Sequence, residues 1–326
     1  MKLSKFFSFA FFLVIGIHMI SSADFFKKAK FEPPDGKVLL IVGQDDKTFD
    51  EYVTSIGKVP GGFMIYTNIQ TMGGLDENSS DYGAGRNFTD EMIKKYPDTV
   101  IQIGLYMVDM LKDTYSGKYD KNISKLADWA KKVSIPIFLR IGYECDGTHN
   151  HYDPQEYQTA YKYLVDKLKS AGVNNISYVF HAHGHNVNPS LDVYYPGDEY
   201  VDWVAFSYFQ QGQDMMEPVI NFAKKHKKPV MIGESTPMGV GTGMDKLSWQ
   251  AWFQIYFDFI KKHNIKIISY INSNWEVQPM WKGQGWEDAR VQANPYVKKK
   301  WLEEILKDVY LQSSEELYYQ IGYKNK

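Results

Sequence analysis

Two glutamates, Glu144 and Glu234, each come at the end of a short apolar run. Glu144 closes the stretch I-P-I-F-L-R-I-G-Y-E, and Glu234 closes K-P-V-M-I-G-E. Such runs, bounded by proline and glycine, are typical of strands that are buried on both faces. Two carboxyl groups held about 5 Å apart can cleave a sugar bond with retention of configuration, one as proton donor and one as nucleophile. In that chemistry an apolar site or a like-charged neighbour keeps the donor protonated, while the nucleophile stays ionised.

Apolar runs recur along the chain and indicate the elements that must position these glutamates. Helical patterns lie between most of these runs. The clearest begins at Asp153-Pro154 and ends before Gly172. Asp followed by Pro is a typical helix start, and Gly is a typical helix stop. Strands that alternate with helices predict a parallel sheet, and eight of them predict an α/β fold of the (β/α)8 TIM barrel type, in a single domain. In such a barrel the fourth and seventh strand ends face each other across the mouth. The eight runs are Val38–Val42, Phe63–Tyr66, Val100–Gly104, Ile137–Ile141, Ile176–His181, Val201–Phe206, Val230–Gly233 and Ile265–Tyr270.

The predicted helices are less evenly spaced than the strands, and the connection between the fifth and sixth runs is irregular. They cover Thr89–Lys95, Tyr119–Lys132, Asp153–Ala171, Met215–His226, Leu247–His263 and Pro295–Tyr310. A doubly wound open sheet is the main alternative, and it usually carries a glycine-rich phosphate loop after its first strand. Here the first run leads into Gly43-Gln44-Asp45-Asp46, which contains no such loop.

Composition narrows the classes of function. The net charge of −2 and the pI near 6.5 leave no basic surface of the kind that binds nucleic acid. Aromatic residues make up 16% of the chain, and their rings can serve as apolar faces for sugars or simply fill a large core. The sequence predicts no cofactor and no resident metal, and we expect a monomer.

The N-terminus has the pattern of a secretory signal peptide. Lys2 and Lys5 precede an apolar stretch, and small residues follow it up to Ala23. An uncleaved membrane anchor is the alternative, although the apolar stretch is shorter than the ~20 residues that a span needs. We therefore predict a secreted protein, extracellular or periplasmic, with no membrane contact after cleavage. The predicted parts are a signal peptide (1–23), a linker (24–35), the catalytic barrel (36–311) and a C-terminal tail (312–326).

Three short motifs resemble clan A glycoside hydrolases, and among them family 26, which includes endo-β-mannanases and β-xylanases. The motifs are L-R-I-G-Y-E-C-D-G, V-D-W-V-A-F-S-Y-F and K-P-V-M-I-G-E-S. The resemblance implies that Glu144 is the acid/base and Glu234 the nucleophile. It also implies that Tyr208 hydrogen-bonds the nucleophile and that Trp275 forms an aromatic floor under the sugar. The expected activity is endo-acting, retaining hydrolysis of a β-linked polysaccharide such as mannan, xylan or β-glucan.

Two departures from the resemblance concern the sugar rather than the reaction. The residue before the acid/base is usually Asn in the clan and His in family 26 mannanases, whereas here it is Tyr143. The loop after the acid/base is T-H-N-H-Y, where family 26 mannanases tend to have a tryptophan-rich loop. By the resemblance, both positions lie near the 2-hydroxyl of the bound sugar and the neighbouring sugar-binding subsites. The sequence therefore does not define which sugar the enzyme accepts.

Further polar residues at strand ends are candidates for supporting roles. Arg140 lies inside an apolar run, so it needs a partner, and a carboxylate at the barrel mouth is expected. Asn272 and Gln44 are suited to bind sugar hydroxyls, and so are His181 and His183. The last two belong to an H-x-H-x-H motif that ends at His185, and alternate residues of a strand share a face.

Two other kinds of function remain open at this stage. In the first, His181 and His183 bind the metal of a metal-dependent barrel hydrolase, for which the other strand ends offer few further ligands. In the second, the chain is a carbohydrate-binding barrel without catalysis. The presence of both glutamates favours the glycosidase over each of them.

Overall fold

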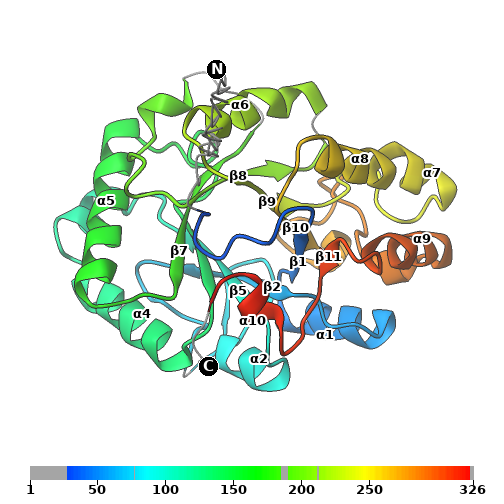
Figure 1. Cartoon of the computed structure of the whole chain (residues 1–326), viewed down its shortest axis with the longest axis horizontal. Helices are drawn as coiled ribbons and strands as arrows, with labels where there is room; N and C mark the ends of the chain where they lie inside the picture. The colour runs from blue at the N-terminus through cyan, green and yellow to red at the C-terminus, as the bar shows by residue number, and fades with distance from the viewer. Residues whose placement is uncertain (1–27, 77, 185–189, 211–212, 324–326) are drawn as a thin grey trace, which may run out of the picture.

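The protein is a closed (β/α)8 barrel, as predicted. The computed structural model describes residues 28–76, 78–184, 190–210 and 213–323. The predicted signal peptide, the first residues of the predicted linker and His185 therefore lie outside the described residues. Helices surround a central ring of strands (Figure 1). Among the described residues, no helix combines the length and the apolar character needed to cross a membrane.

Eight parallel strands form the barrel, and all eight predicted runs are strands. Neighbouring strands pair in chain order, and the ring closes where Leu39 of the first strand pairs with Ile267 of the last. Nearly every residue of these strands is buried, as expected for strands covered by helices outside and by packed side chains inside. The barrel strands are β1 (Val38–Gly43), β2 (Gly62–Asn68), β5 (Val100–Tyr106), β6 (Ile137–Ile141), β7 (Ile176–Ala182), β8 (Trp203–Tyr208), β9 (Val230–Ser235) and β10 (Ile267–Ile271).

Helices cover the outside of the barrel, and most predicted helices are found within a few residues of their expected bounds. The helix predicted over Leu247–His263 consists of α7, a π-helical turn (Trp249–Phe253) and α8. The last one, α9, ends at Ile305 rather than Tyr310, because Tyr310 and Leu311 form the short strand β11 that pairs with β1. The helices are α1 (Asp46–Ile56), α2 (Thr89–Lys95), α3 (Leu111–Tyr115), α4 (Asp120–Val133), α5 (Pro154–Ser170), α6 (Glu217–Lys225), α7 (Lys246–Ser248), α8 (Gln254–Lys262), α9 (Pro295–Ile305) and α10 (Leu317–Gln320).

Helix α1 follows β1 and was not predicted, although its ends carry clear signals. The Asp45 side chain accepts a hydrogen bond from the Thr48 backbone N–H, and Gly57 ends the helix in the left-handed conformation. Both features are typical helix caps. Its buried face carries Phe49, Tyr52 and Ile56 at helical spacing, so the sequence does contain the signal for this helix.

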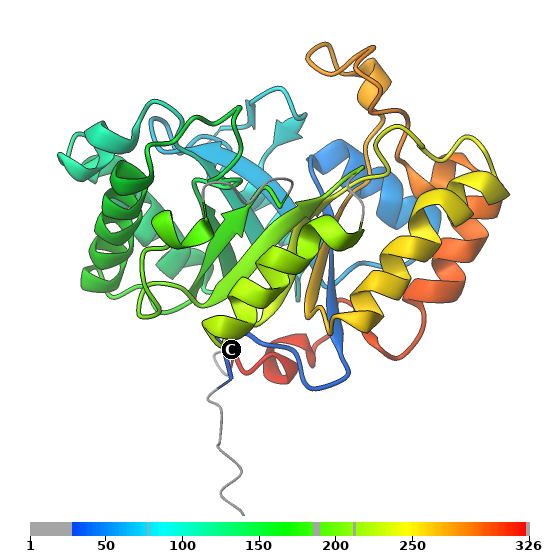
Figure 2. The ribbon, with the colours of Figure 1, turned by 90° about the horizontal axis from the view of Figure 1, so that it is seen from above.

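The two ends of the described chain pack at the edge of the barrel opposite the strand carboxyl ends, where α10 is drawn in red (Figure 2). Phe31, in the predicted linker, is buried and contacts the rings of Phe138 and Tyr323 edge-on. In the predicted tail, the Tyr318 hydroxyl donates to the Thr99 carbonyl oxygen at 2.8 Å. These flanking segments are therefore part of the packed structure and close the bottom of the barrel.

The loops at the carboxyl ends of the strands are mostly longer than those at the opposite end, and they form the mouth of the barrel. The loop after β2 carries a two-stranded hairpin, β3 (Ser80–Asp81) and β4 (Arg86–Asn87). The segment after β10 begins with the short helix η4 (Trp275–Val277) and projects beyond the other loops (orange in Figure 2). The Trp281 indole N–H donates to the Gly83 carbonyl oxygen at 3.0 Å, so these two loops meet on one side of the mouth.

Candidate active site

The fourth and seventh barrel strands each bring one glutamate to the mouth. Glu234 lies within β9, one residue before its end, whereas Glu144 lies three residues past the end of β6. Both side chains are largely buried, with 6% of Glu144 and 7% of Glu234 exposed. Glu144 has a positive φ of 52°, which is uncommon for a residue with a side chain and typical of functional positions.

Arg140 is fully buried inside the barrel and forms an ion pair with Glu234. The space for its side chain comes from Gly104, which lies opposite Arg140 in the neighbouring strand. A Cβ at Gly104 would lie 2.8 Å from Arg140 Nη2 and 2.6 Å from the Tyr66 ring. The rings of Tyr66 and Tyr143 also lie 5.3 and 5.2 Å from the guanidinium carbon, so two aromatic faces and one carboxylate surround the buried charge. The expectation that Arg140 pairs with a carboxylate at the mouth is confirmed.

A buried chain of hydrogen bonds connects Arg140 with Glu144. Arg140 Nη1 lies 3.2 Å from His181 Nδ1, and His181 Nε2 lies 3.2 Å from Ser207 Oγ. The Ser207 hydroxyl in turn donates to Glu144 Oε1 at 2.5 Å. Gly233 leaves room for the imidazole, since a Cβ there would lie 2.9 Å from His181 Cε1.

The direction of this chain is fixed at Arg140, because a guanidinium only donates hydrogen bonds. His181 Nδ1 must then accept, so the imidazole is neutral and its Nε2–H faces Ser207. Burial, the first cause, and the charge of Arg140 lower the pKa of His181 well below its ordinary value, which agrees with the neutral form. Ser207 therefore donates to Oε1 of Glu144, and a proton on this carboxyl group belongs on Oε2.

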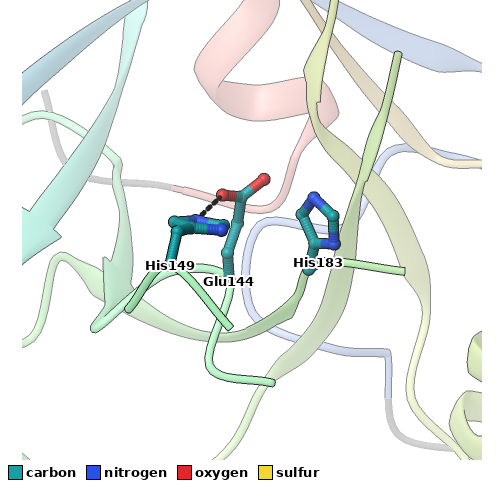
Figure 3. Close-up of side chains that lie close together, drawn as sticks. All are labelled: Glu144, His149 and His183. Atoms are coloured by element: carbon teal, nitrogen blue, oxygen red, sulfur yellow. Dashed lines mark hydrogen bonds and ion pairs between the residues drawn. The ribbon is translucent and has the colours of Figure 1, made fainter. Parts of the chain in front are cut away.

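Two histidines flank the carboxyl group of Glu144 (Figure 3). His149, on the loop after β6, places its Nε2 2.8 Å from Glu144 Oε2. Its side chain is 52% exposed. His183 follows β7 and is half-buried, with its ring 5.4 Å from that of His149.

The two carboxyl groups differ in their electrostatic surroundings. Burial raises the pKa of Glu144, but the hydrogen bond with His149 and the neighbouring His183 lower it, to about 2. Burial also raises the pKa of Glu234, and the Arg140 guanidinium offsets only part of that rise. The ion pair still favours the carboxylate form of Glu234, because a neutral partner would leave Arg140 as an unpaired buried charge.

The opposite pKa shifts of Glu144 and His149 favour the proton on His149 rather than on Glu144 in the free protein. The hydrogen bond with Glu144 raises the pKa of His149 above its ordinary value. Because the two groups are in direct contact, the pair holds one proton between them, and the pair titrates as a unit. This differs from the sequence-based expectation that the donor carboxyl group is itself kept protonated.

Tyr208 does not occupy the place that the resemblance implies. Its ring packs against Trp252, Tyr256 and Phe259 on the helix side of the barrel. The prediction is wrong in register: Ser207, the residue before it, pairs with Glu234 in the neighbouring strand after an irregularity at Phe206 and Ser207. A tyrosine beside Glu234 is Tyr66, within β2, and the hydrogen bond of its side chain lowers the pKa of Glu234.

Two other predicted sugar-binding residues serve the protein's own structure. Asn272 is fully buried, and its amide donates to Gln292 Oε1 and accepts from the Val291 N–H. His181 is also fully buried, between Arg140 and Ser207. Neither side chain faces a substrate, so the expectation is corrected for both.

Three predicted residues keep a place at the mouth. Gln44 is buried, and its Nε2 makes no hydrogen bond within the described part of the chain, so its amide is suited to a sugar hydroxyl. Tyr143 is half-buried, with its ring 5.5 Å from that of Tyr66. Trp275 donates from its indole N–H to Thr236 Oγ1 at 3.2 Å, two residues after Glu234, and its ring contacts Trp281 and Trp286.

The metal alternative on His181 and His183 is not supported by this geometry, because both ring nitrogens of His181 already lie beside Arg140 and Ser207. A different set of three side chains within the described residues is close enough to share an ion. One ligand atom each of Glu144, His149 and His183 lies within 4.8 Å of the others.

The most informative residues that the sequence did not single out are Ser207, His149 and Tyr66. Ser207 stands beside the predicted Tyr208 on β8, and it lies opposite Glu234 because the pairing of β8 with β9 passes over Gly233. His149 belongs to the loop already noted as unusual. Tyr66 carries no signal beyond its position at the end of an apolar run.

The fold and the paired glutamates at its mouth define the chain as a (β/α)8 glycoside hydrolase. A sequence model described as Glycosyl hydrolase family 26 matches residues 66–281. The chain therefore belongs to glycosyl hydrolase family 26, and it is an endo-acting enzyme that cleaves a β-linked polysaccharide.

The relatives with a known activity agree with this assignment. The chain is 30% identical over 321 residues to the β-1,3-xylanase TXYA of a Vibrio species, covering 90% of this chain and 70% of that protein. It is 29% identical over 323 residues to a β-1,3-xylanase of an Alcaligenes species, covering 90% and 68%.

Among solved structures, a family 26 β-mannanase from Bacteroides ovatus superposes with a TM-score of 0.64. It is 16% identical, and the match covers 87% of this chain and 93% of that chain. At this identity the likeness concerns the fold alone.

Proposed function

We propose that the chain is a retaining endo-β-1,3-xylanase in which Glu144 is the acid/base and Glu234 the nucleophile. The observation that carries the mechanism is the buried network at the mouth. Through it, one buried arginine contacts Glu234 directly and reaches Glu144 by way of His181 and Ser207. A single charged group thus holds two carboxyl groups on facing strands, and they have different neighbours.

In the first step, the shared proton passes from His149 Nε2 to Glu144 Oε2. Glu234 attacks the anomeric carbon while the bond to the leaving sugar breaks, and the leaving oxygen takes this proton from Glu144 Oε2. A glycosyl-enzyme ester with Glu234 results. In the second step, Glu144 removes a proton from water, the water oxygen attacks the anomeric carbon, and Glu234 leaves as a carboxylate. The proton returns to the Glu144–His149 pair, so the cycle is balanced.

The surroundings of the two residues support these roles rather than the reverse. A nucleophile must be ionised, and Glu234 contacts a guanidinium that never loses its charge. An acid/base must gain and lose a proton in each cycle. Glu144 has a histidine partner on an exposed loop, which can hold that proton, and Ser207 leaves Oε2 as the oxygen that transfers it.

The proposed substrate comes from the relatives. Both of those that match 90% of this chain are named as β-1,3-xylanases, whereas two structurally similar family 26 mannanases are only 16–17% identical to it. Tyr143 before the acid/base and the loop with His149 after it lie where family 26 mannanases of the resemblance carry other residues. This agrees with a sugar other than mannan.

The predicted setting of the enzyme also remains a proposal. We infer that residues 1–23 are a signal peptide, that the enzyme is secreted and that it acts as a monomer without a cofactor. The proposed catalytic domain is the barrel of residues 36–311, with the packed segments on either side completing it.

The test is release of reducing sugar by the wild type and by Glu234→Gln on a panel of polysaccharides. The panel contains β-1,3-xylan, β-1,4-xylan, mannan and mixed-linkage glucan. We expect the wild type to release most sugar from β-1,3-xylan and the variant to release almost none. A preference for another polymer would overturn the substrate, and a fully active variant would overturn the nucleophile. Binding without hydrolysis would favour the carbohydrate-binding alternative.

A further inference from the structure

Glu144, His149 and His183 form a compact cluster at the barrel mouth that combines one carboxylate with two imidazoles. Their ligand atoms all lie within 4.8 Å of one another, and the carboxyl group stands between the two rings (Figure 3). The cluster spans from buried Glu144 to exposed His149. An ion from solvent can therefore reach the cluster from the side of His149 and bind the buried carboxylate of Glu144.

Hydrogen bonds hold the two loops of the cluster together. The Cys145 backbone N–H donates to the His181 carbonyl oxygen at 2.9 Å, and the His183 N–H donates to Asp146 Oδ1 at 2.6 Å. Within the loop of His149, the Asn150 amide donates to the carbonyl oxygens of Tyr143 and Glu144. The backbone segments that carry the three side chains are thus held together by contacts that do not depend on any ion.

The donor set suits zinc. Two imidazole nitrogens and a carboxylate oxygen, with water as the fourth ligand, are a common set for Zn²⁺, at about 2.0–2.2 Å from the ion. His149 Nε2 already lies 2.8 Å from Glu144 Oε2, and His149, with its exposed side chain, is the ligand that can shift to admit the ion between them. Ser207 would keep its hydrogen bond to Oε1 and orient the carboxylate, as partners of metal ligands typically do.

We propose that these three side chains form a Zn²⁺ site that inhibits the enzyme. The inhibition rests on the proposed function, because Zn²⁺ on Glu144 Oε2 occupies the oxygen that transfers the proton to the leaving sugar. No covalent bond of the substrate changes in this step. The ion and the glycan compete for the same oxygen, so removal of the ion restores hydrolysis.

The first arm of the test measures binding of Zn²⁺ alone to the full chain by titration calorimetry. We expect one ion per wild-type chain, and affinities at least ~10-fold weaker in His149→Gln and in His183→Gln, since even loss of a partner to a metal ligand costs about this much. The matched control is His151→Gln. His151 lies on the same loop with a 59% exposed side chain and contacts Asp109 at 2.9 Å, so its loss should leave binding unchanged.

The second arm measures hydrolysis of β-1,3-xylan at rising Zn²⁺ concentration, with recovery after a chelator is added. Half-inhibition should occur at the same concentration in the wild type and in His151→Gln. It should require at least ~10-fold more ion in His149→Gln, whose activity without zinc serves as its own reference.

The two proposals fail in different ways. Absence of zinc binding by the wild type would overturn the site, and so would unchanged affinity in both His149→Gln and His183→Gln. Zinc binding that follows the variants, in a protein that hydrolyses no polysaccharide, would keep the metal site and overturn the proposed function.

Discussion

The surroundings of Glu234 and those of Glu144 are built differently, although both residues lie at the same mouth. Glu234 is part of a barrel strand and contacts a fully buried arginine. Glu144 lies on a loop with a positive φ, and its partners are a serine and an exposed histidine. The first site has a permanent charge in a rigid frame, and the second has neutral or titratable partners at the edge of solvent.

This difference follows the two tasks that we propose. A nucleophile must reach one carbon atom from a fixed position while it stays ionised, and strands and a buried cation provide both. An acid/base must exchange a proton with a sugar oxygen, with water and with its neighbour. A loop position next to an exposed imidazole allows that exchange. Replacing either glutamate or one of its partners should therefore affect the two sites in different ways.

Glu234→Gln should have the largest effect. An amide cannot form the glycosyl-enzyme, so hydrolysis of polymer and of activated aryl glycosides should both fall by a factor on the order of 10⁴ or more. Rates of sugar release under saturating substrate measure this. If aryl glycosides were still hydrolysed at near the wild-type rate, Glu234 would not be the nucleophile.

Glu144→Ala should slow hydrolysis of the polymer much more than hydrolysis of activated aryl glycosides. Polymer hydrolysis should fall roughly 10²–10⁴-fold because the leaving sugar lacks its proton donor. Aryl glycosides with good leaving groups need little protonation, so formation of their glycosyl-enzyme should be much less affected. Azide, which needs no general base, should rescue turnover and give a glycosyl azide of retained configuration. Equal losses on both substrates without rescue would argue against the acid/base role.

Sequence reasoning reached the barrel and its glutamates because both depend on short-range patterns. Apolar runs bounded by proline and glycine mark buried strands wherever they lie, and the order of strands in a barrel follows from the order in the chain. Glu144 and Glu234 could therefore be placed on facing strand ends. Arg140 could be predicted to need a carboxylate, because a charge in an apolar strand must be paired.

The partners of the glutamates could not be predicted in the same way. Tyr208 and Ser207 are neighbours on one strand and face opposite sides of it. Ser207 is the one opposite Glu234 because the pairing of β8 with β9 passes over Gly233. Such a shift depends on packing across the barrel and leaves no mark in the local sequence. Asn272 similarly appeared to be a sugar ligand because its two structural partners, Gln292 and Val291, follow it by about twenty residues.

Arg140→Met should act mainly on stability and on Glu234. It leaves a buried carboxylate without its partner, and breaking such a pair costs about 3–5 kcal/mol. Chemical denaturation measures the free energy of unfolding. The double variant Arg140→Met with Glu234→Met should recover most of this loss, because replacing both partners of a buried pair by apolar residues is often neutral. A double variant no more stable than the single one would show that the pair is not the source of the loss.

Ser207→Ala should have the smallest effect and should act on Glu144. It removes the donor to Oε1, so the proton is no longer restricted to Oε2, and the remaining polar atoms lose a buried hydrogen bond worth about 1 kcal/mol. We expect polymer hydrolysis to fall roughly tenfold at saturating substrate, the equivalent of about 1.4 kcal/mol, with aryl glycosides little changed. The matched control is Ser235→Ala at the end of the next strand, whose hydroxyl contacts Tyr256 and the Ser269 carbonyl oxygen instead. That variant should lose a similar amount of stability without selective loss on polymer. If both variants slowed the two substrates equally, Ser207 would be a packing residue, and the proton of Glu144 would not depend on the chain of hydrogen bonds from Arg140.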